Sequence, residues 1–318
     1  KESNEFEFDR TFDKYPLVPK EKADFVDIIN IQAYSILKRL DYIGVKTTVL
    51  GISGGLDSTL ALLSLVYAYD LKGIDRKNIH AISMPTENTS SNTFNNAKDL
   101  ANIFGVTYLE IPIQYDVNRE LAILKHDAFD VTYENIQARF RTYTLMNYAN
   151  KHKGIVIGTS DMSEVALGWA TFNGDHMAMY GINAGLAKTT VKATINYYKE
   201  IYPEATVVLD RILNTPISPE LAKEQKTEDL IGKYEINDFI LYHFLVNGAD
   251  EERLLFLLQY VFNLTKEEAK SYFTNFNKRF YSQQYKRLTS PEAAKVLEFS
   301  LSPRTYLRLS GDMYRNDD

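Results

Sequence analysis

The fold is decided by the segment Val49-Leu50-Gly51-Ile52-Ser53-Gly54-Gly55-Leu56-Asp57-Ser58-Thr59-Leu60. Val45 to Ile52 is rich in β-branched and apolar residues, which predicts a buried strand of a parallel sheet. Ser58 to Ala68 is dense in Leu and Ala and predicts a buried helix, capped by Asp57 or Ser58. The glycines between them let backbone amides approach a ligand, and the helix start favours an anion there. The segment therefore predicts a phosphate-binding turn.

Other kinds of strand-to-helix turn compete for this segment. A Walker A loop requires a Lys before the hydroxyl residue at the helix start, where this chain has Leu56-Asp57-Ser58. The dinucleotide-binding fingerprint requires Gly-x-Gly-x-x-Gly, and Gly51-Ile52-Ser53-Gly54 breaks that spacing. An ordinary glycine-rich turn without a ligand is the remaining alternative. If phosphates do bind, the acidic Asp57 beside them requires a cation in between, so we expect Mg²⁺.

Hydrophobic patterns along the rest of the chain predict an α/β fold with a doubly wound parallel sheet. Strands are predicted at residues 45–52, 79–84, 106–111 and 154–158, and helices at 23–40, 58–68, 92–104, 132–150 and 189–200. Strands that alternate with helices form parallel sheets, whose ligands bind beyond the carboxyl ends of the strands. Past residue 219 the pattern becomes helical, at 236–246, 251–262 and 265–281, with Thr265 and Glu268 as a capping box.

Composition excludes several classes of protein. The 318 residues carry a net charge of −6, which argues against broad nucleic-acid binding. The chain contains no run of about 18 apolar residues, so the sequence predicts no membrane-spanning helix. The chain has no cysteine, which excludes disulfides, thiolate metal sites and a cysteine nucleophile. Because no signal-peptide pattern is present, we expect a cytoplasmic protein or a fragment of one.

The strand predicted at 154–158 leads into a second turn, Gly158-Thr159-Ser160-Asp161-Met162-Ser163-Glu164. Ser160 or Asp161 can cap a helix here, with Glu164 completing a capping box. Alternatively, Glu164 faces Asp57 as a second magnesium ligand at the same edge of the sheet. Both interpretations stay open on the residues alone.

Three further segments carry candidate binding residues. Asn135 and Arg139 share a face of the helix predicted at 132–150, which fits a solvated stripe or an arginine aimed at a phosphate or carboxylate. Trp169, the only tryptophan, lies in a glycine-rich loop and is either a core residue or a ligand platform. Lys188, in Gly185-Leu186-Ala187-Lys188-Thr189, stands at a predicted helix start, where a cation suits a phosphate.

Taken together, these segments resemble the NAD synthetase family. Residues 53–58 are similar to the PP-loop of ATP pyrophosphatases, and they are followed in order by YENIQAR at 133–139, GTSDMSEVALGWATFNGDH at 158–176, GLAKT at 185–189 and FYSQQYKR at 280–287. The likeness is greatest to the synthetase half of the glutamine-dependent type. It implies a synthetase domain at 21–318, with an α/β nucleotide-binding core at 21–219 and a helical part at 220–318, after a linker-like segment at 1–20.

The resemblance implies a ligase that amidates deamido-NAD to NAD in two steps. The nicotinate carboxylate attacks the α-phosphate of ATP, which gives an adenylate and pyrophosphate, and ammonia then displaces AMP. The implied catalytic residues are Asp57, Asp161, Glu164 and Lys188, with Asp161 or Glu164 accepting a proton in the second step. Asp57 and Glu164 are the implied Mg²⁺ ligands.

The binding residues are also carried over from the resemblance. Those implied to bind ATP are Gly51, Ile52, Ser53, Gly54, Gly55, Leu56, Asp57, Ser58, Thr159, Lys188 and Ser218. Those implied to bind deamido-NAD are Asn135, Arg139, Glu164, Trp169, Ala170, Thr171, Phe172 and Lys286. The chain departs from the family at Ala187, where Pro is usual, and at Leu288-Thr289-Ser290-Pro291.

Partners and rival functions complete the expectations. Glutamine-dependent enzymes of the family carry an N-terminal glutaminase domain with a catalytic Cys, which this chain does not supply. The chain is therefore expected to be an excised synthetase domain or an enzyme that uses free ammonia, and its linker-like start favours excision. The family forms homodimers, so a homodimer is expected. The rival functions are another PP-loop amidating ligase, of the GMP or asparagine synthetase kind, and a non-catalytic nucleotide-binding protein.

Overall fold

The structure, a computed structural model, describes residues 10–87, 91–215 and 230–313. At its centre lies a parallel sheet with the strand order β3-β2-β1-β4-β5. The strands are β1 (Thr47–Gly51), β2 (Ile79–Ser83), β3 (Thr107–Glu110), β4 (Gly154–Gly158) and β5 (Tyr180–Gly181). The strand order reverses between β1 and β4, which is the switch point where open parallel sheets bind ligands. The predicted doubly wound sheet is thus confirmed.

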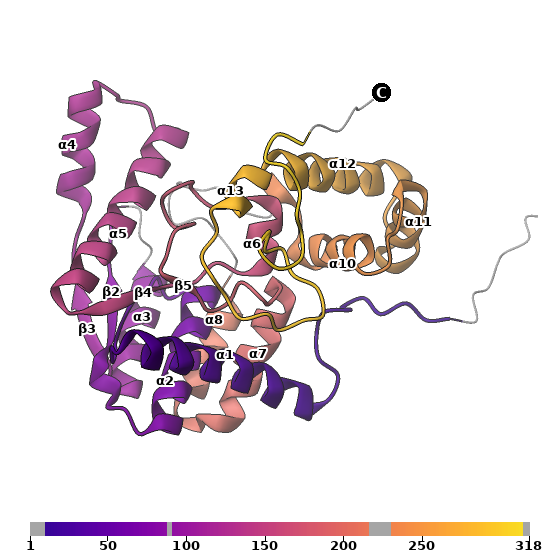
Figure 1. The fold of residues 1–318 in the computed structure, drawn as a ribbon. Helices are drawn as coiled ribbons and strands as arrows, with labels where there is room; N and C mark the ends of the chain where they lie inside the picture. The colour runs from indigo at the N-terminus through magenta and orange to yellow at the C-terminus, as the bar shows by residue number, and fades with distance from the viewer. Residues whose placement is uncertain (1–9, 88–90, 216–229, 314–318) are drawn as a thin grey trace, which may run out of the picture.

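Helices cover both faces of this sheet and extend beyond it (Figure 1). They are α1 (Lys22–Ile43), α2 (Leu56–Lys72), α3 (Ser91–Phe104), α4 (Gln114–Leu124), α5 (Val131–Lys151), α6 (Met162–Leu167), α7 (Lys188–Ile201), α8 (Thr206–Leu213), α10 (Tyr234–Leu245), α11 (Glu251–Phe262), α12 (Lys266–Ser282) and α13 (Gln284–Leu288). Two 3₁₀ turns, η1 (Arg76–Asn78) and η2 (Pro203–Ala205), complete the described elements. No described helix is both long enough and apolar enough to cross a membrane.

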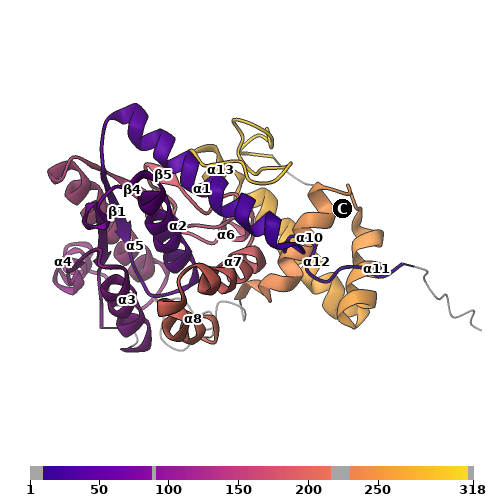
Figure 2. The same ribbon diagram turned by 90° about the horizontal axis from the view of Figure 1, so that it is seen from below.

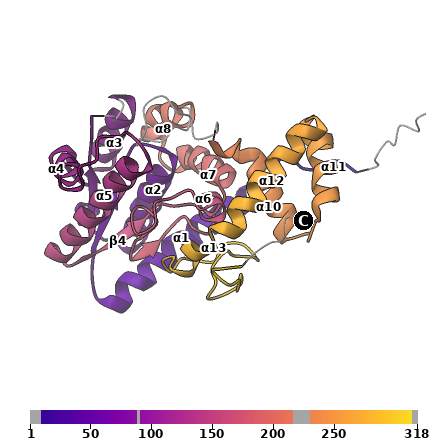
Figure 3. The same ribbon diagram turned by 90° about the horizontal axis from the view of Figure 1, so that it is seen from above.

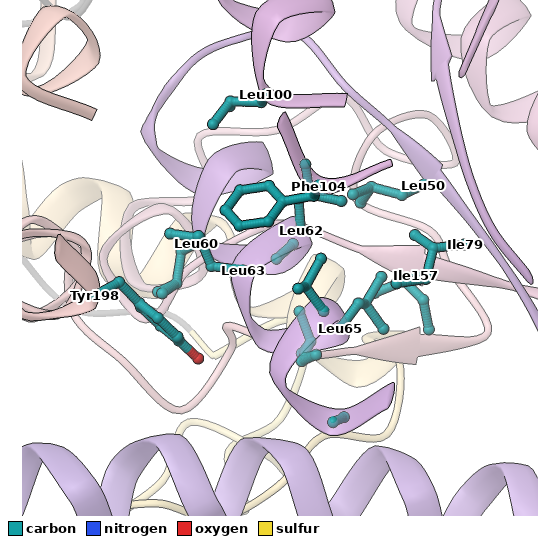
Figure 4. Packing of buried hydrophobic residues seen from close by; sticks show 14 of the residues in the cluster. Leu50, Leu60, Leu62, Leu63, Leu65, Ile79, Leu100, Phe104, Ile157 and Tyr198 are labelled. Atoms are coloured by element: carbon teal, nitrogen blue, oxygen red, sulfur yellow. The ribbon is translucent and has the colours of Figure 1, made fainter. Parts of the chain in front are cut away.

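The alternation of side chains along β1 explains the two layers of helices. Leu50 points into a core shared with α1, α2, α3, α7 and α8, which also contains Leu60 and Tyr198, and it lies beside Phe104 (Figure 4). Its neighbour Val49 points to the opposite face, which α4 and α5 cover (Figure 2). A strand presents successive side chains to opposite faces, so a run of apolar residues is buried on both sides.

Helices α10, α11 and α12 form a separate layer beside the sheet (Figure 3), which we call the C-terminal layer. It has its own hydrophobic core, built around Phe239, Leu258 and Phe280. The predicted capping box is confirmed, because Thr265 and Glu268 bond each other's backbone at the start of α12. The described part of the linker-like segment contains no helix or strand, and its Leu17 packs into this same core.

The remainder of the chain differs from the expected helical part. Residues 289–313 contain no helix and run back to the sheet, where Ala293 forms a parallel bridge with Gly181 of β5. The prediction of Asp57 or Ser58 as the cap of α2 was wrong, since the cap is Gly55. Helices α4, α8 and α13 and the two-residue strand β5 were not predicted, because each is short or has no clear apolar period.

Candidate active site

The turn between β1 and α2 is shaped by glycines and two serines. Gly54 has a φ of 83°, a left-handed conformation that glycine adopts without strain. Ser53 Oγ accepts a hydrogen bond from Gly55 N at 3.2 Å and lies 3.1 Å from Ser58 Oγ, which folds the turn onto itself. Gly55, the cap of α2, provides no side-chain cap. Amides of the first turn of α2 are therefore available to an anionic ligand.

A cleft of about 340 Å³ opens beyond the carboxyl ends of β1 and β4. Residues 51–58 form one wall, and Thr159, Ser160 and Glu164 of the second turn lie opposite. The cleft thus occupies the topological switch point of the sheet, where the sequence predicted a ligand.

The second turn, between β4 and α6, is held in shape by the side chain of its residue Asp161. Asp161 caps α6, and its Oδ1 accepts a hydrogen bond from Glu164 N at 2.8 Å. The Glu164 carboxylate reaches the cleft and accepts a hydrogen bond from Lys188 Nζ at 2.9 Å. Asp161 is thus confirmed as the cap of α6, and the Glu164 carboxylate lies close to that of Asp57. The role of Glu164 as a magnesium ligand stays a prediction.

Lys188, the first residue of α7, joins the two turns. Its side chain is 2% exposed, and its Nζ lies 2.6 Å from Asp57 Oδ2, 3.0 Å from Asp161 Oδ2 and 2.9 Å from Glu164 Oε1. The same Nζ lies 5.0 Å from the centre of the Tyr234 ring. We call Asp57, Asp161, Glu164 and Lys188 the charged cluster.

The charged cluster has an excess of negative charge. With every group ionised, its three carboxylates and one ammonium have a formal charge of −2. Burial raises the pKa of Asp161 well above its usual value and raises that of Glu164 to about 7. Burial lowers the pKa of Lys188, but the three carboxylates outweigh it and hold that pKa well above its usual value. The ammonium thus stays charged near neutral pH, while Glu164 is poised to exchange a proton.

The carboxylates of the charged cluster also fit a divalent cation. Their oxygens lie within 4.8 Å of one another. Asp57 Oδ1 is buried and, among the residues that the structure describes, has no hydrogen-bond partner. Mg²⁺ prefers carboxylate and phosphate oxygens, and one divalent cation would neutralise the formal charge of −2. The donor set therefore suits Mg²⁺, with Asp57 and Glu164 reaching the cleft.

A loop at residues 168–176, between α6 and β5, forms the rim of the cleft. Thr171 Oγ1 donates a hydrogen bond to Asn135 Oδ1 at 2.7 Å, and Arg139 Nε donates to the Phe172 carbonyl at 3.4 Å. Asn135 and Arg139 thus share a face of α5 as predicted, and they use it to hold this loop.

The C-terminal part of the chain holds the loop from the other side. Lys286 Nζ donates hydrogen bonds to the carbonyls of Gly168, at 2.8 Å, and Ala170, at 2.6 Å. The guanidinium of Arg279 lies 5.2 Å from the centre of the Trp169 ring. The residues predicted to bind deamido-NAD therefore lie close together, but the side chains of Arg139 and Lys286 are bonded to backbone carbonyls of the loop.

Most of the predicted site residues gather around the cleft. Those that line it are Gly51, Ile52, Ser53, Gly54, Gly55, Leu56, Asp57, Ser58, Thr159, Glu164, Trp169 and Lys188. Ala170 and Lys286 line a second cavity of about 170 Å³, which shares Gly158, Ser160, Glu164 and Asp175 with the cleft. Ser218 lies outside the described residues.

Asp161 differs from its expected role. Its side chain is fully buried and does not line the cleft, because capping α6 turns it inward beneath Lys188. In this position the Asp161 carboxylate pairs with the Lys188 ammonium and does not reach the cleft.

Among the cleft-lining residues that were not predicted as site residues, three carry ionisable side chains, Arg141, Asp175 and Tyr234. Asp175 accepts a hydrogen bond from Thr171 N at 2.8 Å, and Arg141 Nε donates to the Met84 carbonyl at 3.4 Å. Tyr234 comes from the C-terminal layer and faces Lys188. Asp175 lies inside the motif quoted at 158–176, and Arg141 follows the motif at 133–139 by two residues, so both are visible in the sequence. The position of Tyr234 depends on tertiary packing.

Comparisons with known proteins point to one family. A family model described as NAD synthase matches residues 28–287. Two curated relatives are glutamine-dependent NAD(+) synthetases, from Mycobacterium leprae at 34% identity and from Mycobacterium tuberculosis at 35% identity. Each alignment covers 96% of this chain, but 51% and 50% of the respective relative. The chain therefore spans about half the length of the curated relatives it matches.

Solved structures support the same fold. A glutamine-dependent NAD(+) synthetase from Cytophaga hutchinsonii has a TM-score of 0.74 at 17% identity, covering 91% of this chain and 54% of that one. An NMN synthetase from Francisella tularensis has a TM-score of 0.65 at 24% identity, covering 84% of this chain and 95% of that one.

Proposed function

The chain belongs to the NAD synthase family, and from this premise we propose that it amidates deamido-NAD to NAD with ATP. The reaction is that of a carbon–nitrogen ligase, and it proceeds through an adenylate and releases AMP and pyrophosphate. The observation that carries the proposal is the charged cluster, because it joins a phosphate-binding turn to a second acidic turn at the switch point of the sheet.

In the first step, a carboxylate oxygen of deamido-NAD forms a bond to the α-phosphorus of ATP. The bond from that phosphorus to the β-phosphate oxygen breaks, and pyrophosphate leaves with the electron pair. The attacking carboxylate is already ionised, so no general base is required. Residues 51–58 and Thr159 would hold ATP, and Ser218 stays in the proposed set on the sequence alone. Lys188 would stabilise the charge that develops on pyrophosphate.

Asp57 and Glu164 would hold Mg²⁺ in this site. When bound, the ion supplies Lewis-acid stabilisation of the phosphate charge. Support comes from the unpartnered Asp57 Oδ1 and from the excess negative charge of the charged cluster.

In the second step, the nitrogen of ammonia forms a bond to the carbonyl carbon of the adenylate. The bond from that carbon to the AMP oxygen breaks, AMP leaves with the electron pair, and the nitrogen loses a proton. Glu164 is the better placed proton acceptor, because it lines the cleft whereas Asp161 does not. Asp161 is buried behind Lys188 and would act by fixing that lysine.

Deamido-NAD would bind between the cleft and the loop at 168–176. Glu164 and Trp169 face the cleft, and the other residues of the proposed set are Asn135, Arg139, Ala170, Thr171, Phe172 and Lys286. Lys286 would contribute largely through the shape of the loop, because its ammonium is engaged by two loop carbonyls.

We also propose where the ammonia comes from. The curated relatives are named glutamine-dependent, and this chain aligns with only half of them. A glutaminase part would therefore supply ammonia to the synthetase chemistry, and this chain by itself would accept ammonium directly.

A homodimer is the proposed assembly. Helices α4 and α5 and the segment between them expose large apolar residues, with Phe129 at 83%. The others are Tyr115, Ile123, Leu124, Val131 and Tyr143. Because Asn135 and Arg139 lie on the same α5, a second copy seated here would border the deamido-NAD site. Light scattering that gives the mass of one chain at micromolar concentration would contradict this assembly.

The proposed function is tested by measuring NAD formation from deamido-NAD, ATP and Mg²⁺, with ammonium and with glutamine in parallel. We expect NAD, AMP and pyrophosphate in equal amounts with ammonium, and no product with glutamine. Nicotinate mononucleotide, xanthylate and aspartate serve as alternative acceptors. Pyrophosphate release with one of these, and not with deamido-NAD, would assign a different amidating ligase. ATP binding without pyrophosphate release under any acceptor would support a non-catalytic nucleotide-binding protein.

A further inference from the structure

A buried carboxylate in the C-terminal layer reaches the start of α7. Asp238 of α10 is 1% exposed. Its Oδ2 accepts hydrogen bonds from Thr189 N at 2.9 Å and from Thr189 Oγ1 at 2.7 Å, and its Oδ1 accepts one from Ser163 Oγ. Three elements, α6, α7 and α10, therefore meet at one side chain.

Ser163 extends this connection to the backbone of Lys188. Its Oγ donates to Asp238 and accepts a hydrogen bond from Lys188 N at 2.8 Å. The first two amides of α7 are thus satisfied by Asp238, one directly and one through Ser163. Ala187, the cap of α7, has no side-chain cap to offer. Asp238 supplies from another helix what the local sequence lacks, and its negative charge suits a helix N-terminus.

We propose that Asp238 is a positioning residue that fixes Lys188 within the charged cluster. Lys188 Nζ contacts carboxylates from α2 and from the turn that begins α6, so a small shift of α7 against α6 breaks these contacts. Asp238 and Ser163 hold α7 and α6 together next to that point. The C-terminal layer therefore sets the position of a cation on which the proposed function rests.

The position of Lys188 can be measured without any substrate. Brief acetylation of the native chain, followed by peptide mass spectrometry, reports how accessible each lysine is. In the wild type, Lys188 is buried and ion-paired and should react little, while the exposed Lys192 on the same helix serves as an internal standard. We expect Asp238→Ala to raise labelling of Lys188 relative to Lys192 at least about fivefold. Asp238→Asn should stay near the wild-type value, because its amide oxygen still accepts from Thr189 N.

A matched control comes from the neighbouring residue. Asn237 is 2% exposed, and its Nδ2 donates to the Ile231 carbonyl at 2.9 Å and lies within bonding distance of the Gly232 and Lys233 carbonyls. Within the described part of the chain, its side chain bonds to no other residue. Asn237→Ala should lower the melting temperature about as much as Asp238→Ala and leave Lys188 labelling unchanged. Equal labelling of Lys188 in the Asn237 and Asp238 alanine variants would overturn the proposal.

Kinetics provide the second readout. Asp238→Ala should lower kcat for NAD formation at least about tenfold with a smaller change in the KM for ATP, because it displaces a group that acts in the transition state. Asp238→Asn should restore most of kcat. If Asp238→Ala does not fold, Ser163→Ala tests the same connection. Absence of NAD formation in the wild type would reject the proposed function, whereas the labelling result would still decide the role of Asp238.

Discussion

The neighbouring strands β1 and β4 both continue into a short turn and a helix, but the two helices begin differently. Helix α2 starts after Gly55, which has no side chain to cap it, while α6 starts after Asp161, which bonds Glu164 N. The first turn keeps its shape through Ser53 and a left-handed Gly54.

This difference separates two ways of building an active site. In the first turn, uncapped amides are left for a ligand's phosphates to satisfy. In the second turn, the backbone amide of Glu164 already donates to Asp161, and the turn contributes the Glu164 carboxylate to the cleft. Lys188 is ion-paired with the carboxylates of both turns and so links them. The difference between the turns can therefore be tested by substituting Lys188, by substituting a residue of either turn, or by changing the pH.

Breaking the link should have the largest effect. Lys188→Met removes the ammonium from three carboxylates, and we expect kcat to fall by about 10²–10³-fold, as when a charge-stabilising donor is lost from an active site. Steady-state pyrophosphate release measures this. Lys192→Met, exposed on the same helix, is the matched control and should retain full activity. A Lys188→Met variant within threefold of wild type would show that the link is only structural.

Straining the first turn should have the next largest effect. Gly54→Ala forces an L-residue into a left-handed conformation and should destabilise the chain by about 1–2 kcal/mol. It should also weaken ATP binding, which the fluorescence of Trp169, the only tryptophan, can report. Gly44→Ala is the control, because Gly44 has a φ of 70° and open space around an added Cβ. Equal loss of ATP affinity in both variants would mean that the strain acts globally.

Charge in the second turn should make magnesium binding depend on pH. Burial raises the pKa of Glu164 to about 7, so the carboxyl is mostly protonated at pH 6 and mostly ionised at pH 8. Because Mg²⁺ competes with that proton, its apparent affinity in the presence of ATP should rise about tenfold from pH 6 to pH 8. Titration followed by Trp169 fluorescence measures it. Glu164→Gln should bind Mg²⁺ weakly, and its affinity should no longer depend on pH. If the affinity of this variant still rises with pH as in the wild type, a group other than Glu164 takes up the proton.

Substituting Asp161, the cap of α6, should have the smallest effect of these changes. Asn retains an oxygen that accepts from Glu164 N, whereas Ala does not, so Asp161→Asn should be more stable than Asp161→Ala by about 1 kcal/mol. Urea unfolding of the two variants measures this difference. Equal stability would indicate that the ion pair with Lys188, and not the cap, is the function of Asp161 in this turn.

Local patterns were enough to predict the sheet and both acidic turns. Apolar periods gave the first four strands, and the capping box at Thr265 was visible as a motif. The cap of α2 was mispredicted because Asp57 and Ser58, good capping residues, lie inside the first turn, and the glycine before them serves instead. Strand β5 has only two residues and leaves no period to detect.

The rest of the site depends on contacts between distant segments. Lys188 was expected at a phosphate, and the structure shows it held by three carboxylates from two other helix starts. Tyr234 and Asp238 lie in an apolar stretch of α10 and are distinguished only by what α10 packs against. No local propensity encodes such a neighbour, because packing against another element decides it.

The return of residues 289–313 to the sheet has a consequence for solubility. Gly181 N of β5 donates a hydrogen bond to the Glu292 carbonyl at 2.8 Å, so the outer side of this last strand is covered by the chain itself. An uncovered strand edge is a template on which another chain can pair and aggregate. The irregular C-terminal segment, which has no helix or strand of its own, therefore protects the sheet against unwanted association at the edge nearest the cleft.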